Sequence, residues 1–252
     1  VHSEYTSKIK DDGRRFFSAL KSILSKDHPY KKFSVGNLET LKDQPNTKLR
    51  EAVVNLYNDR YSANQMKLVI LGKEPISTLQ SWAEEKFSNI PNTNITNIDI
   101  NNEFFDAGFL PAKIEVNSIM DRRSMSVAFP VPSASNHKSS QPISYLSNLI
   151  GHEGKGSLLS ELKSQQLVDS LSAGAQFDTN NHAMLMITMS LTEQGLAQQD
   201  NILKVIFTYL ELLRSKGIQK NYFDEQAQML KISFNYQEKS EPIHLTSALA
   251  GA

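Results

Sequence analysis

A histidine and a glutamate stand side by side in a glycine-rich turn, within the stretch LIGHEGKGSLLSELKSQQLVDSLSAGAQF. His152 and Glu153 are residue types that bind zinc, but adjacent residues of a helix point about 100° apart, so both reach one ion only from a loop. The six histidines of the chain form neither H-x-x-E-H nor H-E-x-x-H. His152 is therefore interpreted as a surface or capping histidine.

The same turn resembles a phosphate-binding loop only in part. Such a loop requires G-x-x-x-x-G-K-[ST], whereas the letters GKGS at residues 154–157 place the lysine one position too early. The chain has no glycine-flanked serine nucleophile and no cysteine, which excludes disulfides, thiolate catalysis and cysteine-bound metals. From the residues alone, the chain contains no complete active site.

The overall composition excludes several further classes of protein. The 252 residues include 27 basic and 27 acidic side chains, and this balance argues against a nucleic-acid binder. A hydrophobic content of 39% can fill an ordinary core, and no apolar run approaches the length of a membrane span. The composition predicts a globular chain of one large or two modest domains that binds neither nucleic acid nor membrane.

The elements that must position any site follow from the apolar periodicity. Helical spacing predicts helices near residues 2–25, 49–57, 75–87, 143–150, 202–213 and 223–234, the last with Asn221 as its N-cap. Strands are predicted at 67–71, as a buried central strand, and at 124–131, 168–174 and 182–191, with one more before residue 124. Pro130 favours an edge position for its strand. The pattern predicts an α+β fold with helices packed on a mostly antiparallel sheet.

Several long segments carry a family resemblance. HPYKKFSVGNLETL (28–41), YSANQMKLVILG (61–72), SLTEQGL (190–196), IFTYLELLRSKGI (206–218) and the glycine-turn stretch resemble, in order, segments of the pitrilysin/insulin-degrading enzyme family. Members of this family are zinc metallopeptidases of the inverted H-x-x-E-H type. The resemblance implies two partial pitrilysin-like domains: residues 1–95 as the C-terminal part of the catalytic domain and 112–252 as the second domain. The asparagine-rich residues 96–111 would link them.

The resemblance also implies one zinc ligand near the start of the chain. VHSEYTSKIKDDGRR resembles the helix that carries the family's third ligand, with Glu4 at the ligand position. The H-x-x-E-H motif, and with it every catalytic residue, would lie upstream of Val1. The residues themselves leave a second interpretation open, in which Glu4 belongs to a solvated helix face that also holds an Asp11–Arg15 pair.

A substrate-anchoring site is the second implication. In the insulin-degrading branch, the matching turn and strand grip the N-terminal end of the substrate by adding it as an extra strand. By position, the substrate-binding residues here are Gly151, Leu171, Ser172, Ala173 and Gly174. Ala173 departs from the family pattern, which has two glycines there, so its methyl group could narrow the site.

The expected function is that of a section of a zinc endopeptidase that degrades small peptides in a closed chamber. Its partners would be peptide substrates, together with the N-terminal segment and the C-terminal half of the same polypeptide. Its cofactor would be Zn²⁺, bound by the whole protein. The chain alone is expected to be inactive and to bind no zinc tightly. The alternative is a non-catalytic scaffold or partner-binding subunit that has lost zinc. The resemblance suggests a location in the bacterial periplasm, but the residues themselves do not determine the compartment.

Overall fold

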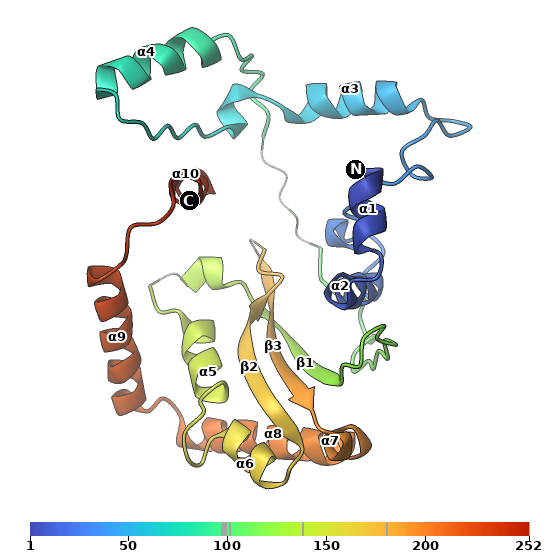
Figure 1. Cartoon of the computed structure of the whole chain (residues 1–252), viewed down its shortest axis with the longest axis vertical. Helices are drawn as coiled ribbons and strands as arrows, with labels where there is room; N and C mark the ends of the chain where they lie inside the picture. The colour runs from blue at the N-terminus through green and yellow to red at the C-terminus, as the bar shows by residue number, and fades with distance from the viewer. Residues whose placement is uncertain (97–99, 101, 138, 180, 252) are drawn as a thin grey trace. The chain divides into compact units, whose positions relative to one another are not determined.

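The computed structural model describes residues 1–96, 100, 102–137, 139–179 and 181–251. They form two compact units (Figure 1). Unit 1 consists of Val1–Val35 and Ile100–Lys231, and unit 2 of Gly36–Asp99 and Ile232–Ala252. The predicted α+β class is confirmed, whereas the division at residues 95 and 111 stays a prediction.

Unit 1 is built on a three-stranded antiparallel sheet in the order β1-β3-β2 (Figure 1). The strands are β1 (Ser124–Pro132), β2 (Val168–Gln176) and β3 (His182–Leu191). Ile187 at the centre of β3 pairs with Val127 on one side and Ala173 on the other. All three strands agree with the predicted ones, and Pro130 lies on an edge strand as expected.

Both faces of β3 are buried over residues 183–187, which explains the continuous apolar run there, whereas Thr188 and Ser190 farther along the strand are exposed. One face carries Leu185, Ile187 and Met189 and packs against three helices. These helices are α5 (Pro142–Ile150), α6 (Leu158–Ser164) and α8 (Gln199–Lys216). The main core of unit 1 therefore lies between this face of the sheet and the helices that follow β1 and β3.

The opposite face of the sheet carries a smaller core. Met184 and Met186 of β3 pack there with a set of apolar side chains from other segments: Leu20, Leu24, Phe104 and Phe177. Leu20 belongs to α2 (Asp12–Ser22), so this second core anchors the N-terminal helices to the sheet.

The single helix predicted over residues 2–25 is wrong. The structure has α1 (His2–Lys8) and α2, separated by residues 9–11. Asp11 caps α2, because its Oδ1 accepts a hydrogen bond of 2.8 Å from the backbone N–H of Arg14. A capping side chain competes with helix continuation, so α1 ends before it. The expected Asp11–Arg15 pair is also absent, since Arg15 Nε lies 3.8 Å from Asp12 Oδ1 instead.

Short helices and α9 complete unit 1. They are η1 (Pro29–Lys31), η3 (Ala134–His137), α7 (Glu193–Ala197) and α9 (Lys220–Asn235), whose last residues fall in unit 2. The predicted N-cap Asn221 lies inside α9, which begins one residue earlier. The extra strand expected before residue 124 is absent from residues 112–123. In the described ranges, no helix is long and apolar enough to cross a membrane.

Unit 2 contains helices but lacks the predicted buried strand. Its helices are α3 (Leu49–Arg60), η2 (Ala63–Gln65), α4 (Ile76–Phe87) and α10 (Pro242–Gly251), of which α3 and α4 match the predicted ones. Residues 67–71 form no strand, and Leu68 and Leu71 are exposed. A strand needs a neighbour for its backbone hydrogen bonds, and the described residues of this unit offer none.

Candidate functional site

The turn after α5 lies directly against the middle of β2. A Cβ atom on Gly151 would sit 3.6 Å from the backbone nitrogen of Ala173 and 3.9 Å from its Cβ. It would also come within 2.9 Å of the Ser147 carbonyl oxygen. Only glycine therefore allows this approach, and the fold brings together the two parts of the predicted substrate site.

Strand β2 has a partner strand on one side only among the described residues. Its residues differ in what they offer to a ligand. Leu171 is buried in the main core and presents only its backbone, whereas Ser172 is exposed and Ala173 is partly buried. A Cβ on Gly174 would meet no heavy atom within 4 Å, and the residue has no positive φ. Glycine is thus not required by the fold there, and the space above it is open.

The glycine turn is held by local hydrogen bonds. Nδ1 of His152 accepts a bond of 2.9 Å from the backbone N–H of Gly154, and its side chain is exposed. Ser157 caps α6, with its Oγ accepting from the Ser160 N–H at 3.1 Å. The exposed ring of His152 agrees with its interpretation as a surface histidine, and its hydrogen bond stabilises the turn.

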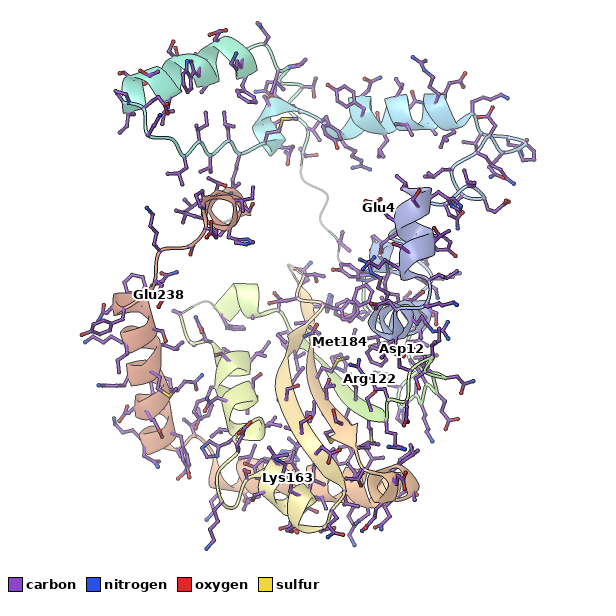
Figure 2. The ribbon with its side chains drawn as sticks, in the orientation of Figure 1. Glu4, Asp12, Arg122, Lys163, Met184 and Glu238 are labelled. Atoms are coloured by element: carbon purple, nitrogen blue, oxygen red, sulfur yellow. The ribbon has the colours of Figure 1, made fainter. Side chains whose placement is uncertain are left out.

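Glu4 lies on α1 with an 81% exposed side chain (Figure 2). Its Oε2 is 3.3 Å from the Val1 amino nitrogen. No group of three His, Cys, Asp or Glu side chains in the described part of the chain could hold a metal ion. A catalytic zinc takes three protein ligands. The residues present therefore do not fit a zinc ion by themselves, and Glu4 can supply one ligand at most.

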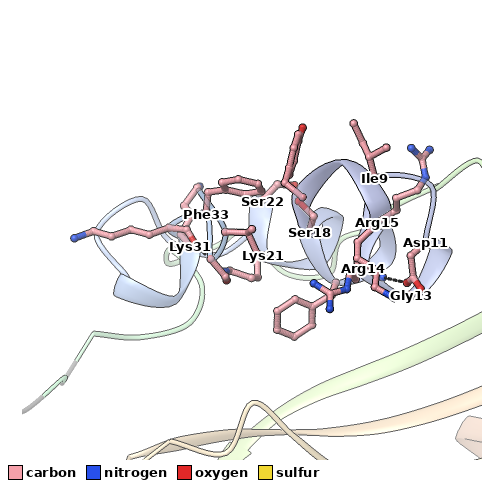
Figure 3. Close-up of a pocket in the computed structure, with 16 residues that line it drawn as sticks. Ile9, Asp11, Gly13, Arg14, Arg15, Ser18, Lys21, Ser22, Lys31 and Phe33 are labelled. Carbon is pink, nitrogen blue, oxygen red and sulfur yellow. Dashed lines mark hydrogen bonds between the residues drawn. The ribbon is translucent and has the colours of Figure 1, made fainter. Parts of the chain in front are cut away.

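The sequence reasoning missed a cavity of about 850 Å³ beside α1 and α2 (Figure 3). Residues of both helices and residues 31–35 line it. Lys21 reaches into this region although it is only 7% exposed, and burial lowers the pKa of its ammonium group. The density of lysine and arginine between residues 8 and 32 was a signal for this site, but it could not indicate that a lysine is buried.

Comparison with known proteins gives a consistent assignment. The sequence profile described as the peptidase M16 inactive domain matches residues 48–230. Insulin-degrading enzyme of Drosophila melanogaster is 34% identical over 98% of the chain. Protease 3 of Escherichia coli K12 is 35% identical over 94% of the chain.

A solved structure agrees with these sequence matches. The crystal structure of pitrilysin matches 99% of the chain with a TM-score of 0.89 and 32% identity. The chain corresponds to 27% of that structure, and to 25% of the length of each of the two relatives. It therefore spans about a quarter of the proteins that it resembles.

Proposed function

Because the chain belongs to the peptidase M16 family, we propose that it forms part of a zinc metallopeptidase that degrades peptides. Within that protein its role is to hold the substrate: the free edge of β2 anchors the N-terminal end of an extended peptide. The chain itself carries no catalytic residue and contributes one zinc ligand.

The close approach of Gly151 to Ala173 is the observation that carries this proposal. It places the glycine turn beside β2, whose outer edge lacks a partner strand in the described part of the sheet. An extended peptide can add to such an edge through main-chain hydrogen bonds. The open space over Gly174 leaves room on that face of the sheet for a side chain of the added peptide.

The strand edge also suits a peptide because β2 pairs along its length with a buried strand. Ala173 and Gly174 pair with Ile187 and Met186 of β3, both of which are buried. A preorganised edge loses little conformational freedom on binding, so more of the hydrogen-bond energy appears as affinity.

Hydrogen exchange tests the anchoring role. The chain is mixed with an extended peptide that has a free N-terminus, and the amides of β2 are expected to exchange more slowly than without peptide. Strand β1 is the internal control, because it is the other edge of the sheet and Pro130 removes one of its N–H groups. No protection of β2, or equal protection of both edges, would refute the anchoring role.

The zinc role rests on Glu4, with two further ligands from a part of the longer protein outside this chain. In that protein, Glu4→Gln should lower zinc content and turnover together, because an amide is a poorer zinc ligand than a carboxylate. Glu225→Gln on α9 is the matched control and should change neither. Full zinc content with normal turnover in Glu4→Gln would assign Glu4 to the solvated face.

A non-catalytic partner-binding subunit is the second candidate. One observation favours it: the matching profile is described as an inactive domain. Metal analysis of the longer protein separates the two candidates. Zinc that depends on Glu4 supports the peptidase, whereas a protein without zinc supports the scaffold.

A further inference from the structure

We propose that the cavity beside α1 and α2, here called the basic cavity, binds an acidic segment of a peptide that also carries apolar side chains. This inference deepens the proposed function, on which it rests for the peptide nature of the ligand, by naming the substrate class. The basic cavity is separate from the β2 edge and is lined by different elements.

The charge of the basic cavity differs from that of the whole chain. Overall, 27 basic residues balance 27 acidic ones. Around the cavity, Asp11 is the one acidic residue that lines it, against six basic residues: Lys8, Arg14, Arg15, Lys21, Lys31 and Lys32. Positive charge concentrated in a concave surface attracts anionic ligands.

Lys21 is the buried part of this site. Its Nζ donates to the Lys32 carbonyl oxygen at 2.5 Å and to Ser34 Oγ at 2.6 Å, both of which are neutral acceptors. It also lies 5.7 Å from the ring centres of Phe17 and Tyr30. No carboxylate within the described ranges forms an ion pair with it. A buried ammonium group without a counter-ion is costly, and an anionic ligand would offset that cost.

Three exposed cations line the same cavity as Lys21. The side-chain nitrogens of Lys8, Arg14 and Lys32 have no ion pair or hydrogen bond with any residue that the structure describes. Figure 3 shows Arg14 and Lys21 on the same helix, with Lys31 and Phe33 on the neighbouring segment. These cations are free to pair with carboxylates of a ligand that extends along the cavity.

The lining also has an apolar part, which favours a peptide over a simple anion. Ile9, Phe17 and Phe33 are exposed there and could contact aliphatic or aromatic side chains. A compact phosphate, by contrast, binds best at free N–H groups of a helix N-terminus. At α2 the Arg14 N–H is already bonded to the Asp11 carboxylate, which would also repel phosphate. The combination points to a ligand with both carboxylates and apolar groups.

Fluorescence anisotropy with labelled peptides tests the proposal on the full chain. The probes are a short peptide of alternating Glu and Phe and its counterpart with Lys in place of Glu. The acidic peptide should bind at least about tenfold more tightly, and its affinity should fall when NaCl rises from about 0.05 M to about 0.5 M. Equal binding of the two peptides, or binding independent of salt, would overturn the proposal.

Charge reversal locates the binding. Arg14→Glu combined with Lys32→Glu changes two exposed side chains and should weaken the acidic peptide at least about tenfold. Lys163→Glu combined with Lys204→Glu is the matched control, since it alters net charge equally on α6 and α8, and should weaken binding less than about threefold. Equal losses in both double variants would show that only net charge matters and would reject the cavity.

A third variant separates the basic cavity from the β2 edge. Lys21→Met removes the buried charge and should reduce the preference for the acidic peptide, while protection of β2 amides by an extended neutral peptide stays unchanged. If β2 protection is absent but the acidic preference is present and depends on Lys21, the anchoring role fails and the basic cavity stands. An acidic preference that is unchanged in Lys21→Met overturns the role of Lys21.

Discussion

Gly174→Ala should preserve the fold and weaken peptide binding, because the folded chain has room for a Cβ at this residue but a bound peptide would need the same space. A Cβ there would meet no heavy atom within 4 Å, and the backbone has no positive φ. Replacing glycine by alanine at such a position stabilises a protein by about 0.4–1 kcal/mol, since the unfolded chain loses freedom. The melting temperature is therefore expected to stay equal or to rise slightly.

Binding should respond in the opposite direction. A peptide strand that pairs with the β2 edge would place one of its own side chains next to this open space, and a methyl group there would crowd that side chain and disturb the pairing. Loss of one or two main-chain hydrogen bonds, each contributing about 1 kcal/mol net, corresponds to roughly a 5- to 30-fold weaker affinity. The affinity is measured by fluorescence anisotropy with an extended, labelled peptide, and the stability by circular dichroism during heating.

Gly251→Ala is the matched control. A Cβ at Gly251 also meets nothing within 4 Å, and this residue lies on α10 in unit 2. The control variant should bind the peptide like the unchanged chain. Unchanged affinity in Gly174→Ala would refute the close approach of a peptide at β2. A clear loss of stability would refute the claim that the space over Gly174 is open.

Three further predictions concern the supports of the site. Gly151→Ala should destabilise the chain by about 1–3 kcal/mol and weaken peptide binding, because the added Cβ would lie 2.9 Å from the Ser147 carbonyl oxygen. Urea unfolding measures the stability and fluorescence anisotropy the binding. A variant with unchanged stability and affinity would contradict the tight turn. Ile187→Ala should lower the free energy of unfolding in urea by about 2–5 kcal/mol, since Ile187 is fully buried between both edge strands. A loss below about 1 kcal/mol would mean that neighbouring side chains move in to fill the cavity. Burial, followed by the charge of His182, lowers the pKa of His28, so the folded state favours neutral His28 and the melting temperature should fall as the pH drops below about 6.5. His28→Asn keeps an acceptor for the Tyr30 N–H and should make this fall less steep. An unchanged dependence of the melting temperature on pH would exclude His28 as its source.

The sequence by itself determined the elements whose apolar spacing is regular. The alternation of Met125, Val127 and Phe129 predicted β1, and the spacing of Ile202 and Ile206 predicted the buried face of α8. These patterns suffice because side chains alternate across a strand and recur every three or four residues on a helix. The family resemblance, which rests on several long sequence segments in a fixed order, likewise agrees with the matching profile and relatives.

Other features depended on the tertiary structure. The apolar run at residues 67–71 has the composition of a buried strand, but a strand forms only where a neighbour supplies hydrogen bonds. The N-terminal helices share one apolar stripe, and only the capping bond of Asp11 shows where the first ends. The candidate sites also depended on the tertiary structure. The approach of Gly151 to Ala173 and the burial of Lys21 bring together separate segments of the chain. Periodicity indicates which face of an element a residue occupies, but not which segment packs against that face.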